Sequence, residues 1–406
     1  MSTLPSKRLL AEELAGEALE LPWVAEPAGP VALASWAPSR GLLYPSTDDR
    51  GASRIYSGRV YLPGLRRVSR AVPLVLFVHA TQGKWDQVPQ FNRGPEAFGG
   101  ALAATLGRFA VAMPDLPGYG RDPSPRPHPF CHGRSLAPAV LDLVQPALGL
   151  LEQARVPWDG RLFILGYSAG GYAAMAAVRE WHDNPRYQHL PLTAAACMAG
   201  PFQLSESIRG CFLRDHPFDH PDVLAMLVTA YHDLYPGVAS LDPRRALSPR
   251  LLEQRPAGFD RGNVLEWVGG SFSTRMISQK INQRLTGSPR QSPRIREVMD
   301  LGWVAREIGA KAWPDTEVGR HLRENDLVGG WCPRVPMLLA TSPTDDCVDP
   351  GNTRAILADW QSQGCRAPVT VRSLTVCGRA LGHLAGAVPA LVMGFRWFQD
   401  QGRPRN

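Results

Sequence analysis

The sequence lacks the cysteine spacing of a structural metal site. Its seven cysteines are scattered, and no two of them form a Cys-x-x-Cys pair. Because their number is also odd, we expect no disulfide framework and free thiols in a reducing compartment. The nearest approach to a metal cluster runs from His128 to His132 and includes Cys131, and a proline-rich loop with incidental ligand-type residues explains it better. We therefore expect no metal and no other cofactor.

Long hydrophobic runs are missing as well. No stretch approaches eighteen apolar residues, which excludes a transmembrane helix from the expectation. Four glutamates interrupt the apolar runs of the first 22 residues, so these residues do not have the pattern of a signal or transit peptide. The sequence thus predicts a cytoplasmic protein.

Lysine is scarce, and the basic residues form no block. The formal net charge is +7, but almost all of the 44 basic residues are arginines, and no basic stretch is interleaved with aromatic side chains. Nucleic acid is therefore not an expected partner. The basic excess favours some attraction for anionic substrates or surfaces.

What the sequence does contain is a series of short apolar runs that alternate with helical patterns such as residues 135–154. This alternation predicts an α/β fold with a mostly parallel sheet, helices on both faces and right-handed crossovers. The runs occupy residues 58–64, 72–80, 109–115, 161–168, 193–201 and 335–343.

The alternation stops after the fifth of these runs. Residues 205–332 contain no convincing buried strand but several helix-like segments, which predicts an inserted helical cap. We expect residues 1–50 to form an N-terminal helix and a connector, residues 51–204 the first part of the α/β core, and residues 333–406 the second part.

The strongest local motif is Gly-Tyr-Ser-Ala-Gly-Gly, which begins at Gly166. It satisfies G-x-S-x-G between an apolar strand and a helix, which is the setting of a nucleophile elbow with Ser168 at a tight turn. Larger side chains than glycine at positions 166 and 170 would collide across that turn. The Ala169 N–H, at the start of the helix, is then one oxyanion donor. A glycine-rich turn with a chance serine is the alternative, and the strand and helix on either side favour the elbow.

A serine hydroxyl needs a base, and His383 is the expected one. It stands in a glycine-flanked loop after the final predicted strand, residues 370–376, and before a C-terminal helix. The serine, acid and histidine of such a site follow in this order along the chain. His182 and His189 lie too close behind the serine, and His321 belongs to a polar helical segment of the insertion.

The acid is expected directly after residues 335–343, where three aspartates compete. Asp345 lies three residues before Val348, a spacing found in many hydrolases, and is preferred over Asp346 as the partner of the imidazole. The unused aspartates, including Asp349, would form turns or caps. A more distant alternative follows the preceding strand, at Asp215 or Asp219.

The second oxyanion donor is expected in the loop His-Ala-Thr-Gln-Gly, residues 79–83, most naturally at the backbone N–H of Thr81. His79 in the same loop precedes the serine and has no evident acid partner. We therefore interpret His79 as a supporting hydrogen-bonding residue and not as a base.

Taken together, these motifs resemble the α/β-hydrolases of the lipase and esterase group, with a layout similar to secretory-type lipases. The resembling segments are residues 42–64, 79–83, 113–120, 166–171, 342–353 and 381–386. The resemblance implies the α/β-hydrolase fold, a triad of Ser168, Asp345 and His383, and a helical cap over the site. The chain departs from the family at Ala80, where glycine is usual.

The expected activity is hydrolysis of a small-molecule acyl ester through an acyl-enzyme on Ser168. Alternatives on the same residues are a peptidase or amidase and an acyltransferase or thioesterase; a binding protein that has lost catalysis is less favoured. Trp267, Phe272 and Met276 in the insertion either line an apolar acyl pocket or belong to the core of the cap, and the second interpretation is the stronger for each.

Overall fold

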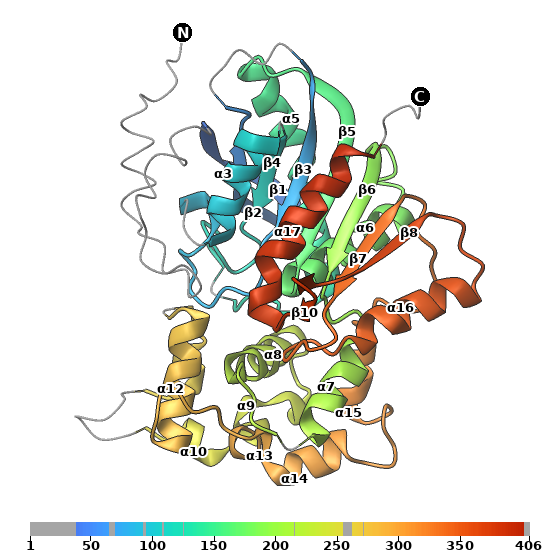
Figure 1. The fold of residues 1–406 in the computed structure, drawn as a ribbon. Coiled ribbons are helices and arrows are strands. Elements are labelled where there is room, and N and C mark those ends of the chain that lie inside the picture. The colour runs from blue at the N-terminus through green and yellow to red at the C-terminus, as the bar shows by residue number, and fades with distance from the viewer. Residues whose placement is uncertain are drawn as a thin grey trace.

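A twisted sheet of eight strands forms the centre of the computed structural model (Figure 1). The structure describes residues 38–64, 70–91, 95–107, 109–124, 126–214, 216–254, 262–270 and 272–401. The strand order is β1-β2-β4-β3-β5-β6-β7-β8. The strands are β1 (Ser39–Thr47), β2 (Ser53–Tyr61), β3 (Val72–Val78), β4 (Ala110–Pro114), β5 (Trp158–Tyr167), β6 (Leu192–Met198), β7 (Met337–Thr341) and β8 (Val369–Ser373).

Strands β3 to β8 are parallel to one another. Strand β2 pairs antiparallel with β4, and β1 pairs antiparallel with β2 at one edge of the sheet. Every residue of β3 and of β4 is buried, as expected of parallel strands that are covered on both faces. Each predicted apolar run overlaps a strand. Because β3, β5, β6 and β7 are parallel to one another, their carboxyl ends lie at the same end of the sheet.

Part of the connector expected within residues 1–50 is a strand, β1. Its residues 39–47 pair along their whole length with β2. The sequence pattern did not predict this strand, for a physical reason. An edge strand has only one neighbour, and β1 alternates irregularly between buried and exposed residues, so it lacks the continuous apolar pattern of the central strands. The predicted N-terminal helix lies outside the described residues.

Two hydrophobic layers cover the sheet. Helices α3 (Pro95–Gly107) and α17 (His383–Gln399) pack on one face, against buried residues such as Phe77 and Phe163. Helices α4 (Gly133–Leu141), α5 (Val144–Gln153), α6 (Ala169–Asp183) and α16 (Gly351–Ser362) pack on the other. Figure 1 shows α17 crossing the near face of the sheet and reaching its lower end.

Between β6 and β7, the described residues form helices and two isolated β-bridges and no strand. We call this stretch, residues 204–323, the helical segment; in Figure 1 it lies at the end of the sheet where α17 begins. Its α-helices are α7 (Leu204–Leu213), α8 (Pro221–Leu234), α9 (Pro243–Ala246), α10 (Pro249–Leu252), α11 (Val264–Trp267), α12 (Thr274–Thr286), α13 (Ile295–Val298), α14 (Leu301–Trp303) and α15 (Glu317–Arg323). Its buried side chains join the hydrophobic layer that also contains α4 and α6.

One helical stretch of the described chain, Gly133–Gln153, has the length and mean hydropathy of a membrane span, by length and composition alone. More than half of it, 56%, is buried inside the protein. Residues 135–141 of α4 are all buried, and α4 packs closely against α6. The apolar side chains of this stretch therefore belong to the hydrophobic core of the protein.

The expectation of unpaired cysteines is wrong, because Cys332 and Cys365 form a disulfide. Their Cα atoms are 5.3 Å apart although 33 positions separate them in the chain. The spacing of cysteines reveals only pairs that are close in sequence. This disulfide instead joins the segment before β7 to the turn after α16, so spacing could not reveal it. The other five cysteines are free, so the cysteines no longer support the predicted reducing compartment.

Candidate active site

Ser168 occupies a strained turn between β5 and α6. Its φ is 58°, in the left-handed region that side chains other than glycine rarely adopt. The turn is tight enough that a Cβ on Gly166 would strike the carbonyl of Gly170, and a Cβ on Gly170 would strike the carbonyls of Val78 and His79. Both glycines are therefore required sterically, and the turn has the geometry of a nucleophile elbow.

His383 and Asp345 meet Ser168 in one hydrogen-bonded line. The Ser168 Oγ lies 2.7 Å from His383 Nε2, and His383 Nδ1 lies 2.9 Å from both carboxylate oxygens of Asp345. The side chains of the histidine and the aspartate are 5% and 0% exposed, so little water competes for these bonds. The structure thus brings together the three residues that the sequence predicts as nucleophile, base and acid.

The backbone of His383 is held on both sides. The Tyr167 hydroxyl donates to the His383 carbonyl at 2.6 Å, and the His383 N–H donates to Asp346 Oδ1 at 2.7 Å. Burial, assisted by the charge of Asp345, raises the pKa of Tyr167, so its hydroxyl keeps its proton and remains a donor. Asp346, the alternative acid, therefore contacts the main chain of the histidine and not its ring.

The remaining candidate acids have other partners. Asp345 Oδ1 also accepts the N–H groups of Cys347 and Val348, at 3.0 and 2.8 Å, which orients the carboxylate. Asp349 accepts from the Gly351 N–H and pairs with a guanidinium, as expected of a capping residue. Asp219 is bonded to a serine on the surface of the helical segment. Asp215 lies outside the described residues.

The start of α6 and the loop after β3 supply the candidate oxyanion donors. Ala169 is the first residue of α6, whose leading N–H groups have no partner inside the helix. Thr81 is half-buried in the loop, and among the described residues its N–H has no acceptor. The N–H of Ala80 is already taken, since it donates to Glu96 Oε1 at 3.1 Å. Of the Ala80 and Thr81 amides, that of Thr81 is thus the one free to bind an oxyanion.

The loop is braced from two directions. Both ring nitrogens of His79 lie at carbonyl oxygens, 2.7 Å from that of Ala80 and 2.9 Å from that of Asp115. Within the described part of the chain, no carboxylate is hydrogen-bonded to the ring. His79 therefore supports the loop, as the sequence indicated. From the other side, Glu96 on α3 binds both the Ala80 N–H and the side-chain amide of Gln82, each at 3.1 Å.

We expect Glu96→Ala to lower kcat for an ester about tenfold with little change in KM, because a loosened loop aims the Thr81 N–H less accurately. Glu96→Gln keeps an acceptor for Ala80 and should retain most of the activity. Steady-state kinetics of both variants check this expectation. A rise in KM alone would show that Glu96 affects ground-state binding instead.

The three apolar residues considered for a substrate pocket differ in how far they are buried. Trp267 is 1% exposed and lies under the cations of Lys280 and Arg284, which identifies it as a core residue of the helical segment. Phe272 is half-buried, and Met276 is 46% exposed. The core interpretation is therefore right for Trp267 and wrong for Met276.

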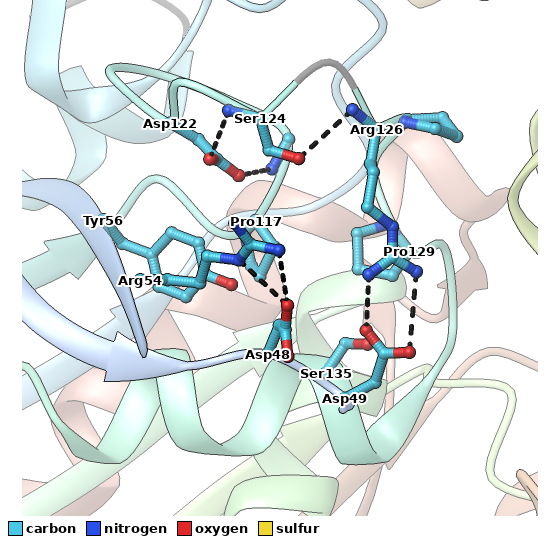
Figure 2. A pocket seen from close by; sticks show the side chains of 12 residues that line it. Asp48, Asp49, Arg54, Tyr56, Pro117, Asp122, Ser124, Arg126, Pro129 and Ser135 are labelled. Carbon is cyan, nitrogen blue, oxygen red and sulfur yellow. Dashed lines mark hydrogen bonds and ion pairs between the residues drawn. The ribbon is translucent and has the colours of Figure 1, made fainter. Parts of the chain in front are cut away.

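A charged pocket, lined by none of Ser168, Asp345 and His383, lies between the β1–β2 turn and the loop of residues 117–124 and 126–129 (Figure 2). Four of its charged groups pair with one another, Arg54 with Asp48 and Arg126 with Asp49. The fifth, Asp122, accepts the backbone N–H groups of Gly118 and Ser124. Arg126 also pairs with Asp233 of α8, so it ties the helical segment to the sheet. These pairs explain the charges of this pocket structurally.

Sheet order, flanking helices and the elbow together define the α/β-hydrolase fold. The chain is similar in structure to the rice cell wall degrading esterase LipA from Xanthomonas oryzae, with a TM-score of 0.68, 21% identity, and coverage of 89% of this chain and 88% of that one. A predicted hydrolase from Legionella pneumophila matches with a TM-score of 0.72, 19% identity, and coverage of 98% and 97%. Candida antarctica lipase A in its closed state matches with a TM-score of 0.61, 14% identity, and coverage of 89% and 77%. No protein-family profile and no curated protein sequence matches the chain.

The sequence did not reveal the residues that support the site. Tyr167 stands inside the G-x-S-x-G motif, at a position the motif leaves open. Its contact with His383, 216 positions away at the start of α17, depends on the fold. Glu96 has a local signal only as an acidic residue in the first turn of a helix. Neither signal points to the site without the fold.

Proposed function

We propose that this protein is a serine hydrolase that cleaves carboxylic esters through an acyl-enzyme on Ser168. The observation that carries the proposal is the buried line of hydrogen bonds from Asp345 through His383 to Ser168 at the elbow. A serine aligned in this way with a base, which is itself oriented by an acid, has the arrangement of an activated nucleophile.

In the proposed reaction, His383 takes the proton of Ser168 as the hydroxyl attacks the ester carbonyl. The N–H groups of Thr81 and Ala169 hold the oxyanion, and Asp345 stabilises the imidazolium. His383 then returns the proton to the leaving alcohol. A water molecule, deprotonated by the same histidine, releases the acid and restores Ser168.

The named similarities support an ester as the substrate. Two of the proteins that share this fold over most of their length are described as an esterase and a lipase. An amide, a thioester or an acyl acceptor other than water would use the same groups, and the assay below tells these apart.

The test is a series of p-nitrophenyl esters with acyl chains of two to twelve carbons, beside the matched p-nitroanilides and an acyl thioester. We expect turnover of esters to exceed that of anilides at least a hundredfold. A preference for anilides would instead make the protein an amidase. Release of acyl product only when an alcohol or amine acceptor is added would indicate a transferase.

A further inference from the structure

Tyr119 contacts the loop that carries the candidate oxyanion donor Thr81. It lies in the turn after β4, its side chain is buried, and its hydroxyl donates to the carbonyl of Gln82, the residue after Thr81. Among the described residues, this is the only hydrogen bond that the backbone of residues 81–83 makes. Tyr119 therefore holds a part of the loop backbone that has no other hydrogen-bond support there.

Two other residues support this loop at different atoms. His79 contacts the Ala80 carbonyl, and Glu96 binds the Ala80 N–H and the side-chain amide of Gln82. The Ala80 carbonyl and the Thr81 N–H belong to one planar peptide group, so they turn together. The direction of this group also depends on the backbone rotations at Thr81 and Gln82 that follow it. A bond at the Gln82 carbonyl restricts these rotations from the far side.

The Tyr119 hydroxyl keeps its proton at neutral pH. Burial raises the pKa of Tyr119, and the charge of Asp222 raises it further. The Gln82 carbonyl can only accept, so the phenol is the donor of this bond. The bond is therefore present in the resting protein, before any substrate binds.

The ring of Tyr119 is fixed as well. It stacks on the ring of His128, with centroids 4.4 Å apart and an angle of 21° between the planes. Burial lowers the pKa of His128 to about 3, so the imidazole is neutral, and its Nδ1 lies 2.8 Å from the Pro117 carbonyl. A carbonyl needs a donor, so Nδ1 carries the ring proton and this bond orients the imidazole. The hydroxyl of Tyr119 is thus aimed by a rigid neighbour.

Glycines on both sides of Tyr119 shape the turn. Gly118 and Gly120 have φ values of 82° and 64°, which favour glycine. A Cβ on Gly118 would lie 2.7 Å from the His128 nitrogen, and one on Gly120 would strike the carboxylate of Asp115. The Gly120 N–H donates to the carbonyl of Trp85 at 2.9 Å. The same turn therefore holds the loop at a second point, three residues beyond Gln82.

We propose that Tyr119 is a positioning residue of the oxyanion hole, because its bond to the Gln82 carbonyl fixes the direction of the Thr81 N–H. The inference rests on the proposed ester hydrolysis, in which that N–H binds the oxyanion. A donor that is already aimed stabilises the transition state without reorganisation during the reaction. The oxyanion forms only when Ser168 attacks, so the effect falls on kcat and not on KM.

The test is Tyr119→Phe, which keeps the ring and its stacking on His128 and removes only the hydroxyl. We expect kcat for p-nitrophenyl butyrate to fall about tenfold, less than the loss of a whole oxyanion donor, while KM stays within about twofold. An alkyl trifluoromethyl ketone adds to a serine to form an oxyanion. Its inhibition constant should therefore rise about tenfold as well. Titration with a fluorophosphonate gives the concentration of active protein.

Tyr44→Phe is the matched control. Tyr44 is also buried, and its hydroxyl donates to a backbone carbonyl, that of Ala139, at 2.6 Å. This variant loses the same kind of bond in the core, away from the loop. It should lower Tm by a similar amount and leave both kcat and the inhibition constant unchanged.

A replacement that retains a donor gives the complementary result. With p-aminophenylalanine at position 119, an amine N–H takes the place of the phenol O–H and can donate to Gln82. We expect this protein to recover most of the kcat that Tyr119→Phe loses. The inhibition constant does not depend on the fraction of folded protein, so it remains informative if a variant is less stable.

Unchanged kcat and inhibitor binding in Tyr119→Phe would overturn the inference while leaving ester hydrolysis intact. An equal loss of kcat in Tyr44→Phe would also overturn it, because the cause would then be a general loss of stability. Failure of the unaltered protein to hydrolyse any ester of the p-nitrophenyl series would instead refute the proposed function.

Discussion

Ser168→Ala is expected to reduce turnover of a p-nitrophenyl ester about a millionfold, the scale of loss when a nucleophilic serine is removed from such a site. The alanine retains the Cβ, so the strained φ of 58° and the packing of the elbow are unchanged. Only the attacking oxygen and its bond to His383 Nε2 disappear. The measurement is kcat together with covalent labelling by a fluorophosphonate, which reacts with activated serines.

Ser362→Ala provides the control for this experiment, because that serine is exposed at the end of α16 and bonds only to the backbone of its own helix. It should label and turn over like the unaltered protein. Labelling that persists in Ser168→Ala would disprove the assignment of the nucleophile. Absence of labelling in every version, with no ester turnover, would favour a binding protein that has lost catalysis.

The parts of the site that could be predicted from sequence are those whose physical cause is local. The elbow needs glycine at two positions around the serine, since any Cβ there meets a carbonyl, and this requirement is visible as a motif. The preference for Asp345 rested on its spacing from Val348. The structure provides the reason, because the Val348 N–H donates to that carboxylate and fixes its direction.

The parts that could not be predicted depend on residues brought together by the fold. The disulfide closes a separation of 33 positions, and Tyr119 reaches Gln82 from 37 positions away, so neither leaves a trace in local spacing. Strand β1 could not be predicted for a different reason. Its burial pattern follows from having a single neighbour, which the order of the strands determines and the sequence of β1 alone does not.

Asp345→Asn is expected to reduce kcat about ten-thousandfold, whereas Asp346→Asn should cost about tenfold or less. In Asp345→Asn, Oδ1 can still accept from Cys347 and Val348, which leaves the amide nitrogen facing His383 Nδ1. An amide N–H donates, so the Nδ1–H of the reactive tautomer meets a donor there, which favours the tautomer that carries the ring proton on Nε2. That tautomer cannot accept the proton of Ser168.

Asp346→Asn has no such effect on the ring. Its Oδ1 accepts from the His383 backbone N–H, and the oxygen of an asparagine can accept the same bond while the tautomer of the imidazole stays as it was. The two substitutions remove the same charge from adjacent positions, so comparing their kcat values isolates the contact with Nδ1 from electrostatics in general. A larger loss in Asp346→Asn would mean that the field of the carboxylates, and not the orientation of the ring, determines the reactivity of Ser168.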